Sequence, residues 1–384
     1  MKKNNILKVI YFTGFLIALQ SALPAYINST FLNLFIPEKF VGLLYTLGSI
    51  LTIVILIYAS ELLTKFGNYK STITTILIYL ISFIFLVFSN SPQIIAIAFI
   101  VNFTMMMIIG FNIDIFLENF SDDSKTGKIR GFYLTSINIA WVISPMIAGY
   151  LLTNGDYWKI YSISAILTLP ILILIIPNFK KFADPDYKKI PILNTLKEVW
   201  ENKNIYNVVC ASLLLRFFYS WMVIYTPIYL HNTMGFEWSI IGTIFTIMLL
   251  PFILLEIPLG TLADKFLGEK EMLTLGFIII SISTLSLSFL ETKNFLIWAV
   301  ILFCTRVGAS MIEIMTESYF FKNIDAKDTD ILSFFRMTRP LAYAIAPLIA
   351  SAFLIFLDFK YIFLILGIIT LYGLRYSLTI KDTK

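Results

Sequence analysis

Apolar runs long enough to cross a membrane recur along this chain, and short polar stretches separate them. Each run covers about 20 residues, which as a helix spans roughly 30 Å of hydrocarbon. Helices are expected because a spanning segment must satisfy its backbone polar groups internally. The pattern predicts twelve spans, at 8–33, 40–63, 71–89, 93–118, 131–153, 158–178, 205–230, 238–262, 271–290, 294–320, 330–354 and 358–379. The predicted fold is therefore all-α, with twelve transmembrane helices.

One long polar segment divides these spans into two sets of six. We predict an N-terminal bundle at 1–178, a cytoplasmic linker at 179–203 and a C-terminal bundle at 204–384. The linker carries Lys180, Lys181, Lys188, Lys189, Lys197 and Lys203. Within it, Thr195 to Asn202 is predicted to form a short surface helix on anionic headgroups.

Composition and charge agree with a membrane protein. Of 384 residues, 58% are hydrophobic and 14% are charged, whereas a soluble domain carries about 25% charged residues. The net charge of +5 does not indicate a nucleic-acid surface, because the lysines fall in short loops between apolar runs. With the amino terminus inside, four of 29 basic residues lie in outward loops and two lie near mid-span, which leaves 23 toward the cytoplasmic side. The distribution predicts a multi-pass protein of the cell (cytoplasmic) membrane, with both termini in the cytoplasm.

The two halves match each other in register. Val41-Gly-Leu-Leu-Tyr-Thr46 parallels Ile241-Gly-Thr-Ile-Phe-Thr246, and Ala140-Trp-Val-Ile-Ser-Pro145 parallels Ala342-Tyr-Ala-Ile-Ala-Pro347. Asp114 and Glu118 likewise parallel Glu313 and Glu317. The offsets stay between 199 and 202 in the same helix order, which predicts a parallel repeat of six-helix units.

A polar turn after the second helix of each half carries a recognisable motif. Gly260-Thr-Leu-Ala-Asp-Lys-Phe-Leu-Gly-Glu-Lys270 is echoed by Ser60-Glu-Leu-Leu-Thr-Lys-Phe-Gly-Asn-Tyr-Lys70. This turn resembles the signature loop between the second and third helices of each half of major facilitator superfamily transporters. The resemblance covers nearly the whole chain and implies that family's two-bundle fold.

The resemblance also implies a cytoplasmic latch. In the second copy, Gly260 would permit close helix approach, Asp264 would face a helix amino terminus of the other half, and Lys265 and Lys270 would form a basic arm. Gly268 of this copy corresponds to Gly67 of the first. A carboxylate so placed gains about 0.3 to 1 kcal/mol, which is small enough to break in each cycle. The first copy keeps Lys65 and Gly67, but Thr64 replaces the acid, so its latch would be weaker or would use Glu61. The alternative for either copy is a plain solvated turn.

A second set of charges lies near the predicted cytoplasmic face. Glu118 followed by Arg130 resembles the acidic helix end and Arg-Gly loop of sugar-porter relatives, and Glu317 with Arg336 repeats it. We expect these four to form an intracellular gate of ion pairs. Since each exposed pair contributes only about 0 to 1 kcal/mol, a network would be needed. The alternative is ordinary helix-end charge near water.

Charges deep within the spans point to a binding site. Arg216 and Arg306 each lie near mid-span, where an arginine costs about 2.5 to 3.5 kcal/mol. They must face a wet cavity or a carboxylate, and the candidates are Glu256, Glu313 and Asp114. We expect this cluster to bind a polar or anionic substrate, or to carry a coupling proton, between the halves. The alternative is a static buried pair, such as Arg306 with Glu313, although their spacing is too long for a short contact.

Uncharged polar residues at mid-depth, Gln20 and Asn138, are candidates to line the same cavity or to bond across helices. Ser144-Pro145-Met-Ile-Ala-Gly149 partly resembles a motif in the fifth helix of proton-driven drug antiporters, but it lacks the leading glycine.

The chain has no nucleotide-binding Gly-x-x-x-x-Gly-Lys-Ser/Thr motif. It also lacks a catalytic constellation, and with His231 as its single histidine we expect no metal site and no cofactor.

These observations predict a secondary transporter, not an enzyme. It would act as a monomer, with a small polar or anionic solute and the lipid bilayer as partners and with coupling protons as a further hypothesis. Within the same fold, one alternative is a drug/proton antiporter and another is a receptor or scaffold that does not transport. A membrane enzyme acting on lipid is a third. The substrate, the direction of transport and the coupling ion are left open by the sequence.

Overall fold

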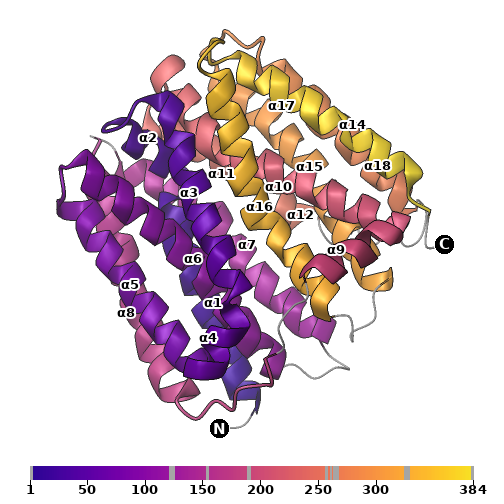
Figure 1. Cartoon of the computed structure of the whole chain (residues 1–384). Coiled ribbons are helices and arrows are strands. Elements are labelled where there is room, and N and C mark those ends of the chain that lie inside the picture. The colour runs from indigo at the N-terminus through magenta and orange to yellow at the C-terminus, as the bar shows by residue number, and fades with distance from the viewer. Residues whose placement is uncertain are drawn as a thin grey trace. The chain divides into compact units, whose positions relative to one another are not determined.

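The computed structural model describes residues 3–120, 126–152, 155–187, 192–255, 258–259, 262, 268–323 and 329–381. Within these ranges every regular element is a helix. The chain divides into two compact units, residues 1–189 with 237–243, and residues 190–236 with 244–384. Figure 1 shows both units as helical bundles.

The helices of the first unit are α1 (Lys3–Ala25), α2 (Asn28–Asn33), α3 (Glu38–Ile57), α4 (Ala59–Phe66), α5 (Asn68–Phe88), α6 (Pro92–Phe120), α7 (Thr126–Leu151) and α8 (Tyr157–Phe179). Those of the second are α9 (Ile192–Glu201), α10 (Lys203–Ile228), α12 (Pro251–Leu254), α14 (Glu269–Leu287), α15 (Phe295–Asn323), α16 (Thr329–Phe353), α17 (Tyr361–Leu371) and α18 (Gly373–Thr379). A π-helical turn follows α10 at Tyr229–Thr233. Helix α11 (Trp238–Leu249) begins among residues assigned to the first unit and ends in the second.

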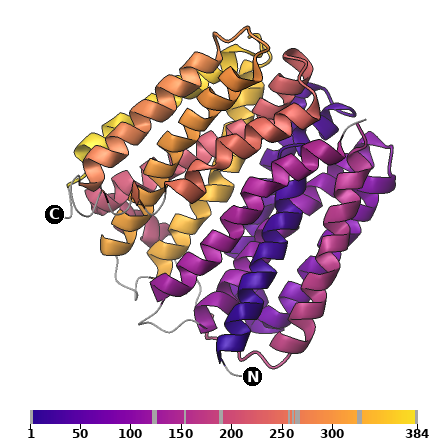
Figure 2. The same ribbon diagram turned by 180° about the vertical axis from the view of Figure 1, so that it is seen from behind.

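Each unit packs its helices in the same pattern. In the first unit α1 lies against α7 and α8, as Figure 2 shows from behind, and α5 lies against α6 and α8. In the second unit α10 packs on α16, and α14 packs on α15 and α17. The corresponding helix of each half thus has the corresponding neighbour, which confirms that the chain is built from parallel repeats.

The predicted spans agree with the described helices. Ten helical segments are long and apolar enough to cross a membrane, and the shorter apolar stretch Trp238–Leu254 and helix α16 fall at the two remaining predicted spans. The linker contains α9, over the stretch where a short helix was expected. The prediction of an all-helical membrane protein of this type is confirmed.

Two predicted spans are interrupted. Pro24 lies near the end of α1, and the chain resumes as α2 after Tyr26 and Ile27. In the second span α3 ends before Tyr58, and α4 then carries most of the first signature loop. The loop is therefore not an extended polar turn, as its composition suggested. The polar residues up to Phe66 are helical, with Leu63 buried on one face of α4, and Gly67 alone separates α4 from α5.

A glycine contact sets the packing of α14 on α15. A Cβ atom added to Gly308 would lie 2.6 Å from the backbone nitrogen of Ile280 and 2.7 Å from the carbonyl oxygen of Gly276. We expect Gly308→Ala to lower the free energy of unfolding by about 1–3 kcal/mol, because the backbones would have to separate. In Gly110→Ala on α6, by contrast, the added atom would meet nothing within 4 Å. That control is expected to match the wild type or gain up to about 1 kcal/mol in a thermal unfolding assay. Equal losses in both variants would contradict this assignment.

Candidate functional site

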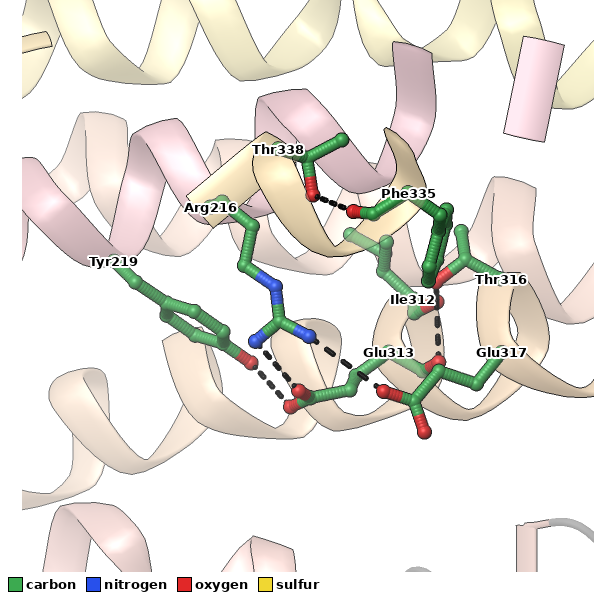
Figure 3. A network of polar contacts seen from close by, with 8 residues as sticks. All are labelled: Arg216, Tyr219, Ile312, Glu313, Thr316, Glu317, Phe335 and Thr338. Atoms are coloured by element: carbon green, nitrogen blue, oxygen red, sulfur yellow. Dashed lines mark hydrogen bonds and ion pairs between the residues drawn. The ribbon is translucent and has the colours of Figure 1, made fainter. Parts of the chain in front are cut away.

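The second unit holds a charged network between α10 and α15 (Figure 3). Nη1 of Arg216 lies 2.8 Å from Oε1 of Glu313, and its Nη2 lies 3.5 Å from Oε1 of Glu317. The Arg216 and Glu313 side chains are 21% and 22% exposed, and that of Glu317 is 38% exposed. The two carboxylates are four residues apart on one face of α15, so one guanidinium reaches both. Mid-span Arg216 is thus neutralised by carboxylates, as its insertion cost requires.

Tyr219 joins this network from the same helix as Arg216. Its hydroxyl donates a hydrogen bond of 2.9 Å to Oε2 of Glu313, so Glu313 engages both side chains. The Arg216 guanidinium carbon lies 5.8 Å from the centre of the Tyr219 ring. Figure 3 shows Arg216 and Tyr219 converging on Glu313 from one side. Removing Glu313 would therefore take the acceptor from the Tyr219 hydroxyl and leave Arg216 with its longer contact to Glu317.

Arg306 occupies a different environment. It is 1% exposed, and among the residues that the structure describes its Nη1 has no hydrogen-bond partner. Its guanidinium carbon lies 5.0 Å from the ring centre of Phe218 and 5.7 Å from that of Tyr219. Aromatic faces attract a cation, but they do not accept the hydrogen bonds of the guanidinium edge as a carboxylate does. Arg306 therefore presents a positive charge and an unused donor in the interior of the second unit.

A third arginine extends the cluster. Arg339, on α16, interacts electrostatically with Arg216, Glu313 and Tyr343. Arg339 is exposed, whereas Arg306 is buried. Among the described side chains of this cluster, the three arginines 216, 306 and 339 outnumber the two glutamates 313 and 317, which gives these five residues one excess positive charge. Such a group can attract an anion more readily than a cation.

Gln20 in the first unit bonds across helices. It is 1% exposed, and its Oε1 lies 3.5 Å from Oγ1 of Thr168 on α8. Tyr79 on α5 also bonds to it. These contacts correspond to the alternative raised for Gln20, a polar residue joining helices, while a place in a cavity stays a prediction.

Two further candidates from the first unit are half-buried. Asp114 lies on α6 and interacts electrostatically with Tyr133 of α7. Asn138 lies on α7. Within its unit, the structure therefore gives Asp114 a tyrosine neighbour on the adjacent helix.

The predicted latch and gate are described only in part. Glu256, Gly260, Asp264 and Lys265 lie outside the described residues. Gly268 precedes α14, Lys270 lies in its first turn, and Lys65 and Gly67 lie at the end of α4.

The residues predicted to form the gate lie on four helices. Glu118 is exposed near the end of α6, and Arg336 is half-buried on α16. Arg130 belongs to α7, and its side chain lies outside the described part of the structure. Of the gate residues, Glu317 contacts Arg216. The latch and gate roles stay predictions.

Sequence reasoning missed Arg339 and Tyr219. Arg339 was counted with the cytoplasmic charges, although it lies nine residues beyond the predicted start of its span, or about two and a half turns. That depth was a usable signal. The signal for Tyr219 was weaker: this residue follows Arg216 by three positions and so lies on the same helix face.

Comparison with known proteins places the chain in a family. The protein-family model described as "Major Facilitator Superfamily" matches residues 10–324 and, in a second match, residues 239–380. None of the curated proteins compared with the chain matches it.

Two solved structures illustrate the likeness in fold. One is a bacterial homologue of the human lysosomal transporter Spinster, inward-facing and unoccupied, at 11% identity and a TM-score of 0.67, over 98% of this chain and 93% of that one. The other is a mutant of the peptide transporter POT in complex with alafosfalin, at 14% identity and a TM-score of 0.73, over 97% of this chain and 92% of that one. With the family match over most of its length, the chain belongs to the Major Facilitator Superfamily.

Proposed function

We propose that this protein is a secondary transporter that moves a small anionic solute across the cytoplasmic membrane by alternating access, with both termini in the cytoplasm. The observation that carries the choice of substrate is the buried Arg306, whose Nη1 has no hydrogen-bond partner in the described part of the chain. An unsatisfied buried donor costs about 1–3 kcal/mol, and more when it is charged. An anion that accepts from this donor removes that cost, so the site favours a bound carboxylate or similar group.

The surrounding residues support this assignment. Arg216 is already engaged by Glu313 and Glu317, so it competes less for an incoming anion than Arg306 does. The rings of Phe218 and Tyr219 flank Arg306 and would exclude water from its bond to the anion. The excess charge contributed by Arg339 attracts an anion toward the cluster. In this proposal the glutamates neutralise Arg216, the aromatic rings exclude water, and Nη1 of Arg306 binds the anion.

The first experiment is a thermal-stability screen of the purified protein against monocarboxylates, dicarboxylates, phosphate esters, sugars and amines. An anion at 100 times its dissociation constant should stabilise the protein by about 2.7 kcal/mol. Uptake of that anion into proteoliposomes then tests transport. Stabilisation only by neutral or cationic compounds would overturn the anionic assignment. Binding without uptake would indicate a receptor of the same fold.

Proton coupling through Glu313 is a second proposal, favoured by its bonds to both Arg216 and Tyr219. A proton on Glu313 would weaken its attraction for Arg216 and free that cation, so substrate and proton could influence each other at one network. Uptake is expected to rise when an imposed inward pH gradient drives proton entry. The gradient-free rate and the rate of Glu313→Gln serve as references. Uptake that ignores the gradient in the wild type would rule out this coupling.

A further inference from the structure

The start of the central linker returns to the first unit and contacts the beginning of α5. The backbone nitrogen of Asn68, the first residue of α5, donates a hydrogen bond of 2.7 Å to Oδ1 of Asp184. Gly67 has a φ of +74°, which favours glycine, and a Cβ there would lie 2.6 Å from Oδ2 of Asp184. A glycine at this turn is thus needed for its backbone angle and for the room it leaves to the carboxylate.

Two aromatic residues of the same linker segment strengthen this contact. The hydroxyl of Tyr187 donates a hydrogen bond of 2.6 Å to Oδ1 of Asp184. Burial and the Asp184 carboxylate raise the pKa of Tyr187 above its ordinary value, which is the direction expected for a phenol that donates to a carboxylate. On the other side, the ring of Phe182 lies 4.7 Å edge-on from that of Phe116 on α6. Residues 182–187 are thereby held to the first unit at two points, Asn68 of α5 and Phe116 of α6, while Tyr187 fixes the Asp184 carboxylate from within the segment.

Comparison of the two repeats explains why α5 uses an acid from the linker. The first turn of α5 contains no acidic residue, and its N-cap, Gly67, has no side chain with which to cap it. The equivalent helix of the second unit, α14, has Glu269 and Glu271 in its first turn. Free amide groups and the helix dipole make a carboxylate favourable at this end. Asp184 therefore provides at the start of α5 the carboxylate that α14 has in its own first turn.

We propose that residues 180–187 are a releasable clasp that sets the free length of the tether between the two units. While the clasp is closed, only residues 188–191 lie between it and α9. When Asp184 leaves α5 and Phe182 leaves Phe116, residues 180–187 are no longer held to the first unit and add to the tether. The range of motion allowed to the bundles then increases. The last consequence depends on the proposed transport function, whereas the clasp does not.

Hydrogen exchange of the purified full-length protein, without substrate, tests the clasp. In Asp184→Ala we expect exchange in peptides covering 180–187 and the first turn of α5 to become roughly tenfold to hundredfold faster, since the lost hydrogen bond has a charged acceptor. The matched control is Asp186→Ala, which removes an exposed acid two residues away. Exchange in Asp184→Ala that equals the control at both segments would overturn the proposal.

A second pair of variants separates the clasp from simple helix capping. Lys70→Glu places an acid at the position equivalent to Glu271, in the first turn of α5. Combined with Asp184→Ala, it should restore slow exchange to α5 but leave 180–187 fast. Recovery of both segments would contradict a clasp that depends on Asp184. Gly67→Ala should open both segments, because its new methyl group excludes the carboxylate.

Uptake measurements then test the consequence for transport. If the anion identified above is transported, Asp184→Ala should change its maximal uptake rate at least twofold relative to Asp186→Ala while leaving its affinity unchanged. An unchanged rate with fast exchange at 180–187 would refute the role in transport and keep the clasp. Absence of uptake in the wild type would instead count against the proposed function.

Discussion

Replacing Arg306 with methionine is expected to weaken binding of the anionic solute by roughly 30-fold to several thousandfold, because removing one partner of a buried charged hydrogen bond costs about 2–5 kcal/mol. The same substitution should leave the unliganded protein as stable as the wild type, or more stable. Methionine buries no charge and no unsatisfied donor, whereas Arg306 buries both. Ligand titration and thermal unfolding of one preparation measure both quantities.

The opposite signs of these effects distinguish a binding role from a structural one. If Arg306 served the fold alone, Arg306→Met would destabilise the protein without ligand. Arg375→Met, at an exposed position on α18, is the control for loss of an arginine and should alter neither quantity. Undiminished anion binding in Arg306→Met would refute the proposed site. Arg306→Lys should recover only part of the binding, because an ammonium lacks the planar fork of the guanidinium.

Removing the carboxylate of Glu313 should cause the largest loss of stability in this unit. Glu313→Ala leaves Arg216 with only the longer contact to Glu317 and deprives the Tyr219 hydroxyl of its acceptor. Breaking a buried ion pair from one side costs about 3–5 kcal/mol. Glu317→Ala should cost about 0–1 kcal/mol, since that side chain is 38% exposed and its contact with Arg216 is 3.5 Å. Chemical or thermal unfolding in detergent compares the two.

A double variant checks the cause of this loss. In Arg216→Met combined with Glu313→Leu, no uncompensated charge remains, so much of the stability should return. The coupling energy between the two positions, obtained from Arg216→Met alone, Glu313→Leu alone and their combination, should then be large. A double variant as unstable as the sum of the single variants would show that Glu313 acts through packing and not through Arg216.

Features that depend on neighbours along the chain could be predicted from the sequence. The helices follow the apolar runs because lipid leaves the backbone no other means of satisfying its polar groups. Arg216 and Arg306 were recognisable as unusual from their depth alone, and Glu313 as an available acid. The partner of each arginine was not predictable. Glu313 pairs with Arg216 on another helix, while Arg306 faces aromatic rings.

The sequence by itself determined the class of protein, the repeat and the approximate span boundaries, because hydrophobicity and periodicity are local quantities that a bilayer converts directly into helices. Tertiary structure alone decided which buried charges are neutralised and which carboxylate caps α5. Asp184 and Asn68 are far apart in sequence, and nothing in either segment encodes their contact. Such contacts depend on the packing of whole helices, since a charged group gains stability from whichever partner the fold brings within a few ångströms.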